Sequence, residues 1–266
     1  MIRRDLEGDW FLITQPEHAR LSGFLAGHWG ENEDFPRPEP RDEVVLAAAA
    51  HDNGWREWDA RPSLNTDGAP AFMYENPIGE VFKIGHRGVG RLCDQGHPYA
   101  AALVSRHHVN WAADILTGAR KIRTITPDLR SEIEAFKSAQ AERQAQLCER
   151  LREQPEFEEA VAPERFHRNA RYVWTFDMLS LLLCCRWPHI ETLRDVPEGD
   201  GFGDIQVKFV DDWNLHVSPW PFDSDVLEFA VRGPRLPAKS FDSQSDFWAA
   251  LKDTPESEVI FRYSPG

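Results

Sequence analysis

A histidine–aspartate pair ends an almost wholly apolar segment of the chain. His51 and Asp52 follow the string VVLAAAA, and Asp177 lies within a second apolar string, WTFDMLSLLLC. A carboxylate buried without a partner is costly, so a carboxylate in a protein core usually has a cation beside it. A divalent metal ion shared by His51, Asp52 and Asp177 would supply that charge. Arg171 or Arg186 is the alternative partner for Asp177.

His18 is the candidate metal ligand nearest the start of the chain. Leu21 and Leu25 follow it by one and two helical turns, so the imidazole shares the apolar face of an expected helix. His28, at the end of the same helix, is the alternative to His18.

Two adjacent histidines, His107 and His108, lie midway along another expected helix. Neighbouring residues of a helix point about 100° apart, so these two cannot face inward equally. A ligand set of imidazoles and carboxylates without thiols suits Fe, Mn, Zn, Co or Ni. The sequence therefore predicts a centre of one or two divalent transition-metal ions.

The order His, His-Asp, His, Asp resembles the HD-domain superfamily of metal-dependent phosphohydrolases. The string AAAAHDNGW is similar to the family's apolar helix with its metal-binding doublet, and FDMLSLL is similar to its closing helix. The likeness covers residues 10–190. More narrowly, the chain resembles an uncharacterised bacterial branch of the superfamily, through QPEHARLSGFLA, AAAAHDNGWREWD, HPYAAALVSRHH and SPWPF.

The resemblance implies a ligand set and a fold. The four core ligands would be His18, His51, Asp52 and Asp177, and Asp52 would bridge two ions where a second is present. The second ion would be held by histidines that follow the doublet, in order of preference His107, His108 and His97. The doublet is followed by Asn-Gly-Trp in place of the usual Gly-Lys, and the Gly-Tyr-Pro signature of cyclic-dinucleotide esterases is missing. The resemblance therefore names no specific substrate.

Such a centre predicts phosphate-ester hydrolysis of a small phosphorylated metabolite or nucleotide by a metal-activated water. Asp52 would act catalytically through the metal, and the leaving oxygen would take its proton from His97, Glu57 or Asp59. Phosphate oxygens would be held by Arg106, Arg56 or Lys83. Two alternatives remain: a di-iron oxygenase of the HD fold, and a metal-binding or regulatory module without turnover.

The elements expected to position these residues are mainly helices. Apolar periodicity and proline starts predict helices over 17–29, 42–52, 97–117, 126–152 and 163–187. Residues 53–95 are expected to be mostly loop, with a turn at GHRGVGR, and helix 126–152 a peripheral arm because its apolar stripe is thin. Short alternating segments predict strands over 205–210, 214–220, 226–231 and 259–263. The predicted fold is mainly α: an HD-like helical bundle over 1–195 with a small β-rich extension over 196–266.

The charge balance of the chain disfavours some classes of binding partner. Thirty Lys and Arg face 44 Asp and Glu, a net charge of −14, which disfavours nucleic acid as the main ligand. The start MIRRDLEGDW has no apolar signal region, and no apolar run approaches the length of a membrane span. The four cysteines form no CxxC pair, so neither a disulfide framework nor a thiolate zinc site is expected. We expect a cytoplasmic protein with a small anionic substrate, no membrane partner and a possible homodimer.

Overall fold

The computed structural model describes residues 1–30, 34–118 and 124–266. The helices are α1 (Gln15–His28), α2 (Arg41–Ala50), α3 (Arg56–Asp59), α4 (Ile78–Asp94), α5 (Pro98–Thr117), α6 (Pro127–Arg152), α7 (Pro163–Cys185) and α8 (Gln244–Asp253). Two 3-10 segments, η1 (Asn53–Trp55) and η2 (Met73–Glu75), lie between α2 and α4. The five long helices expected from apolar periodicity are therefore present.

The helix ends follow local chemistry. At the start of α1, Thr14 accepts a hydrogen bond from the Glu17 amide at 3.2 Å, and Pro16 occupies the first turn. Helix α5 ends at Gly118, whose φ of 77° is the left-handed conformation that glycine adopts without strain. These ends fix where the histidines of α1 and α5 fall.

The remaining elements form one seven-stranded sheet in the order β1-β2-β6-β7-β5-β4-β3. Its strands are β1 (Ile2–Leu6), β2 (Asp9–Ile13), β3 (Thr192–Glu198), β4 (Gly201–Phe209), β5 (Asn214–Ser218), β6 (Leu227–Pro237) and β7 (Glu256–Pro265). The pairing of β5 with β7 is parallel and the other five are antiparallel. The sheet is thus mixed.

The prediction of a mainly α protein with a small β extension is wrong. The sheet takes strands from both ends of the chain, because β2 pairs with β6 through registers such as Asp9 with Pro237. The hairpin of β1 and β2 turns at Gly8, whose φ is 77°. Residue 195, where the predicted bundle was expected to end, lies inside β3.

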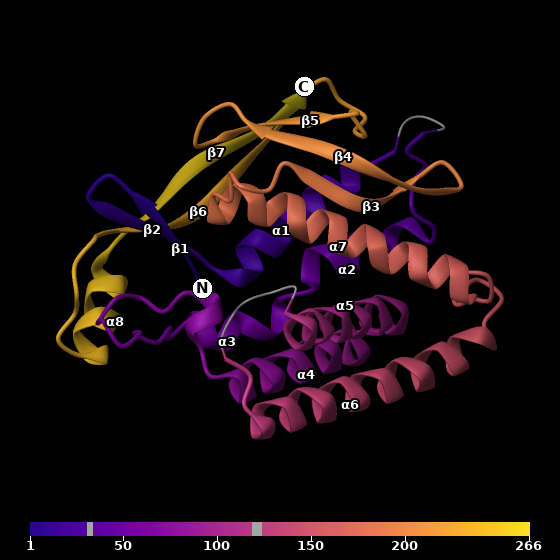
Figure 1. Ribbon diagram of the computed structural model, residues 1–266, viewed down its shortest axis with the longest axis horizontal. Coiled ribbons are helices and arrows are strands. Elements are labelled where there is room, and N and C mark those ends of the chain that lie inside the picture. The colour runs from indigo at the N-terminus through magenta and orange to yellow at the C-terminus, as the bar shows by residue number, and fades with distance from the viewer. Residues whose placement is uncertain (31–33, 119–123) are drawn as a thin grey trace.

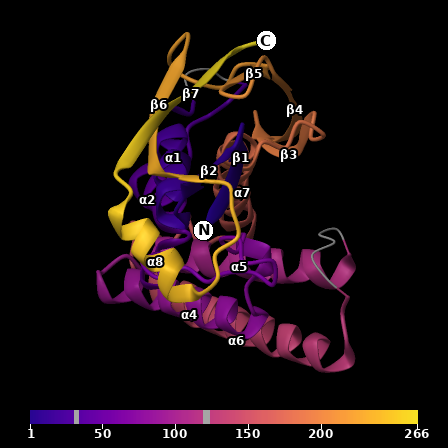
Figure 2. The same cartoon turned by 90° about the vertical axis from the view of Figure 1, so that its left-hand side faces the viewer.

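The sheet curls over α1 and α7, and α4, α5 and α6 form a layer on the other side of these two helices (Figures 1 and 2). The largest apolar core contains side chains of α1, α2, α5 and α7 together with those of the sheet. Helix α6 packs lengthwise along α5 and buries one face, which includes Ile133, Phe136 and Leu151. Its thin stripe is therefore a packed face.

The expectation of mostly loop over residues 53–95 is also wrong, because α4 occupies 17 of these 43 residues and η1, α3 and η2 together occupy ten more. Its apolar residues recur at helical spacing, but four glycines lower the helix propensity of the segment. Close packing explains two of these glycines. A Cβ at Gly85 would lie 3.2 Å from His108 Nδ1, and a Cβ at Gly88 would lie 3.0 Å from Asn53 Oδ1. Helix α4 thereby approaches both α5 and the segment after Asp52.

Among the described residues, no helix combines the length and the apolar character needed to cross a membrane.

Candidate metal centre

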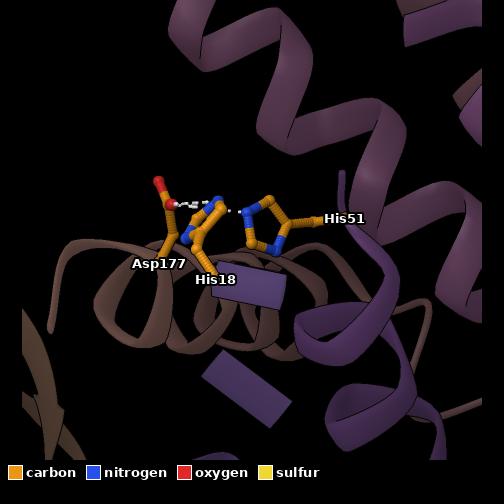
Figure 3. A group of neighbouring side chains, drawn as sticks. All are labelled: His18, His51 and Asp177. Carbon is orange, nitrogen blue, oxygen red and sulfur yellow. Dashed lines mark ion pairs between the residues drawn. The ribbon is translucent and has the colours of Figure 1, made fainter. Parts of the chain in front are cut away.

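Three residues from distant parts of the chain meet between α1, α2 and α7. His18 lies on α1, His51 caps the end of α2, and Asp177 lies on α7. One ligand atom of each lies within 4.8 Å of the others, and all three residues are buried. Figure 3 shows the two imidazoles and the carboxylate facing one another. This cluster could bind a metal ion, as the sequence predicted for these three residues.

Each imidazole of the cluster is held by its Nδ1 atom. His51 Nδ1 lies 2.8 Å from the Ala48 carbonyl oxygen, to which it donates. His18 Nδ1 lies 2.8 Å from Ser180 Oγ, and the Ser180 hydroxyl donates to the Asp177 carbonyl at 2.9 Å. The Ser180 oxygen therefore accepts from His18 Nδ1. Both Nε2 atoms are left to present lone pairs to the cluster, which is the usual arrangement of metal-binding histidines.

Carboxylate oxygens surround the two Nε2 atoms. Asp177 Oδ1 lies 3.3 Å from His51 Nε2 and 3.8 Å from His18 Nε2. Asp52 Oδ2 lies 3.1 Å from His18 Nε2 and 3.7 Å from His51 Nε2. Two lone pairs and two carboxylates thus converge, and hydrogen-bond acceptors so arranged need a cation among them.

The electrostatics of the cluster show this need for a cation. Burial alone would lower the pKa of His51, but the charges of Asp52 and Asp177 outweigh it and raise that pKa to about 9. Burial would raise the pKa of Asp52, yet His51 and His18 lower it to about 2. The same two effects leave the pKa of Asp177 well below its usual range. In the absence of metal, a proton on His51 is therefore the cation.

The histidines of α5 extend the cluster. His107 Nε2 lies 3.7 Å from Asp177 Oδ2, and the ring centroids of His107 and His51 are 5.2 Å apart. His108 follows with its ring 6.0 Å from that of His107. Burial lowers the pKa of His107 to about 3 and that of His108 to about 4, and the buried Nδ1 of each lacks a hydrogen-bond partner. Both are neutral at pH 7 and carry available lone pairs.

The cluster forms one wall of a cavity of about 70 Å³. All six histidines and aspartates predicted as metal ligands line it: His18, His51, Asp52, His107, His108 and Asp177. Most of the other lining residues are apolar or aromatic and include Trp55, Ile84, Trp111, Phe136 and Leu181. Among the described residues that line the cavity, there is no lysine or arginine.

The residues predicted to donate a proton do not line this cavity. His97 Nδ1 lies 2.8 Å from Glu43 Oε1, in a separate groove beside α6. Glu57 is exposed and forms ion pairs with Arg87, at 3.3 Å, and with Arg91. Asp59 is buried, and its two oxygens accept from the Met1 ammonium group at 2.7 Å and from the Gln15 amide at 2.6 Å.

The residues predicted to hold phosphate do not line the cavity either. Arg56 and Lys83 are exposed, and Lys83 pairs with Glu80 at 2.7 Å. Arg106 precedes His107 on α5 and is half-buried. None of the three belongs to the residues that surround the cluster.

The alternatives weighed from the sequence have other partners. His28 pairs with Asp223 at 2.7 Å. Arg171 donates to the backbone oxygens of residues 194 and 195, and Arg186 pairs with Asp212 at 2.6 Å. Asp177 therefore has histidines beside it, and neither of these arginines.

Two supporting residues were missed in the sequence. Ser180 holds His18, and Gln15 lines the cavity one turn before His18 on α1. The signal for Ser180 was a hydroxyl at i+3 from Asp177 within a run of leucines. The signal for Gln15 was an uncharged polar residue on the same helical face as His18.

Fold and cluster together define a protein with a curled mixed sheet over helices that enclose a potential metal site. The chain belongs to the family described as "Protein of unknown function (DUF3891)", whose sequence model matches residues 1–238. No curated protein and no solved structure matched the chain. The resemblance to the HD-domain superfamily stays a prediction.

Proposed function

We propose that the protein is a metal-dependent hydrolase of a small phosphate ester. One observation carries the proposal: two imidazole lone pairs and two carboxylates converge at the wall of one cavity, with both Nδ1 atoms already engaged. A ligand set without sulfur suits Fe, Mn, Zn, Co or Ni. The ligands would be His18, His51, Asp52 and Asp177, with His107 and His108 beside them.

A bound divalent ion would supply a water with a pKa near neutrality and a positive charge for a phosphate oxygen. The chain's own residues prepare the cavity for this chemistry. Ser180 and the Ala48 carbonyl hold both imidazoles in the tautomer that leaves Nε2 free. His107 and His108 remain neutral at pH 7, so each offers a lone pair to a second ion.

The number of ions decides whether an anion is attracted. Asp52 and Asp177 contribute two negative charges, so one divalent ion leaves the cluster neutral and two leave it at about +2. No described lining residue adds a lysine or arginine charge. Hydrolysis of a phosphate dianion therefore requires a second ion, for which His107 and His108 are the available donors.

The apolar walls favour a second candidate function, an oxygen-dependent oxidation at iron. Trp55, Ile84, Trp111, Phe136 and Leu181 suit an uncharged carbon compound better than an anion. The same ligand set would hold the iron.

Metal analysis joined to two activity assays tests these proposals. We expect two metal ions per chain and release of phosphate from p-nitrophenyl phosphate that continues without oxygen. In Asp52→Ala both the metal and the activity should fall, whereas Asp204→Ala, on the exposed side of β4, should leave both unchanged.

Two other outcomes would contradict the proposed hydrolase activity. Iron with oxygen consumption and no phosphate release would favour the oxygen-dependent reaction at iron. Bound metal without either activity would favour a regulatory module.

A further inference from the structure

Gln15 is a buried amide on the wall of the cavity. It opens α1, one turn before His18, and is 3 % exposed. Its Nε2 donates to Met73 Sδ at 3.2 Å, whereas its Oε1 has no hydrogen-bond partner. A buried carbonyl oxygen without a partner loses its hydration and gains nothing in return, so such atoms are uncommon in folded proteins.

The position of Gln15 is fixed by its surroundings. Its backbone N–H donates to Asp59 Oδ2 at 2.6 Å, and Asp59 Oδ1 accepts from the Met1 ammonium group at 2.7 Å. Met73, which receives the amide N–H, is itself buried. Gln15 is therefore held in place among the residues that line the cavity, with its Oε1 left without a partner.

The rest of the cavity explains what this oxygen would meet. Outside the metal cluster, Gln15 is the one described lining residue with a buried hydrogen-bonding atom that lacks a partner. The walls beyond it are apolar, with Trp55, Trp111 and Phe136 among them. An ordered water needs two to four polar partners, and these walls supply few. A ligand with one donor on an apolar body matches the cavity better.

We propose that Gln15 determines specificity, because its Oε1 accepts a hydrogen bond from an O–H or N–H group of a small, uncharged and otherwise apolar organic group. This inference deepens the proposed function by naming the organic part of the substrate, and it rests on that proposal for the assignment of the cavity as the substrate site. A nucleoside carries several donors and acceptors, whereas Trp55, Trp111 and Phe136 offer mainly apolar surface.

Phenol and fluorobenzene provide a matched pair of probes. The two rings are similar in size, and the phenol carries the O–H donor that fluorobenzene lacks. We expect phenol to bind the wild-type protein about threefold to tenfold more tightly than fluorobenzene, the effect of one hydrogen bond. In Gln15→Met the ratio should fall to about one while the affinity for fluorobenzene stays the same. NMR titrations of the full chain, with and without metal, measure both affinities.

The ratio of the two affinities distinguishes a lost hydrogen bond from misfolding, because a misfolded variant would lose the binding of fluorobenzene as well. Gln95→Met, at the exposed end of α4, is the matched control and should keep the wild-type ratio. A ratio that persists in Gln15→Met, equal affinities in the wild type, or no binding of either probe would overturn the inference. Metal content and phosphate release measured on the same samples separate the two proposals. A preference for phenol without hydrolysis would contradict only the proposed hydrolase activity and would leave the role of Gln15 intact.

Discussion

Among the imidazole–carboxylate groupings of this molecule, the pair of His97 with Glu43 and the buried cluster around His51 differ in what surrounds them. His97 Nδ1 faces Glu43 Oε1 at 2.8 Å, and Glu43 Oε2 accepts from the Ala100 amide at 2.9 Å. Both groups of that pair have hydrogen-bond partners, and His97 is half-buried. His51 and Asp177 instead form a buried group in which acceptors face acceptors.

The difference teaches that residue type alone does not make a site. The Glu43 carboxylate of α2 faces the start of α5, where it accepts from the Ala100 backbone N–H and lies beside the His97 imidazole. Glu43 therefore needs no further partner. The buried cluster has its Nδ1 atoms satisfied and its Nε2 atoms directed at negative charge. Only the second arrangement calls for a metal ion or a proton.

The largest expected effect separates the two groupings directly. Asp177→Asn keeps the volume of the side chain and removes the charge, so metal affinity should fall more than about 100-fold, beyond the loss typical of residues that only support ligands. Glu43→Gln should leave metal affinity within about twofold of the wild type, because Glu43 lies outside the cavity. Titration of the metal-free proteins with Zn²⁺ or Mn²⁺ measures both. Equal losses in the two variants would contradict the comparison.

A second prediction concerns the segment that follows Asp52. A Cβ at Gly54 would lie 2.1 Å from the Ile84 carbonyl oxygen, so Gly54→Ala must push this segment away from α4. We expect a loss of about 1–3 kcal/mol in the free energy of unfolding, the usual cost of overpacking. Gly79→Ala, where nothing lies within 4 Å, should be neutral or stabilising. Urea denaturation measures both, and similar midpoints would refute the tight packing beside Asp52.

The smallest effect is the coupling of metal binding to pH. The pKa of His51 is raised to about 9, so the metal-free protein carries this proton at pH 7 and a metal ion must displace it. Affinity should rise about tenfold per pH unit from pH 7 and level off above pH 9. In the metal-free protein, the stability given by this proton is present below the ordinary pKa of 6.5 and is lost as the pH rises through 9.

Calorimetry at pH 7 in two buffers of different ionisation enthalpy counts the protons released. About one is expected from His51, and none from His107 or His108, which are already neutral. His97→Ala, in the pair with Glu43, should leave the count unchanged. A count of zero in the wild type would show that His51 carries no proton to displace.

The sequence allowed the long helices and the three cluster residues to be predicted, because both depend on local apolar patterns. His51, Asp177 and His18 each had apolar neighbours at helical spacing, which places them inward. Helix α4 was missed because glycines that serve close packing weaken the local helix signal. The joining of β2 with β6 was missed because it unites residues more than 200 positions apart, and no local pattern encodes that pairing.

The supporting contacts of the site were equally inaccessible from the sequence. Whether His97 lines the cavity depends on where the start of α5 packs, because His97 precedes the helix and lies about 15 Å along its axis from His107. The unpartnered oxygen of Gln15 could be recognised only once its neighbours were known.

The place of β7 in the sheet has a consequence for how the protein is made. Strand β7 lies between β6 and β5, yet it follows all the other described strands in sequence and lies beyond the residues matched by the family. On the ribosome, β1, β2 and β6 can pair with one another, and so can β3, β4 and β5, but no other described strand pairs with both groups, so they remain unpaired with each other until residues 256–265 emerge. All residues of the metal cluster are synthesised before β3, so the helices can gather around the cavity while the sheet above them is still in two halves.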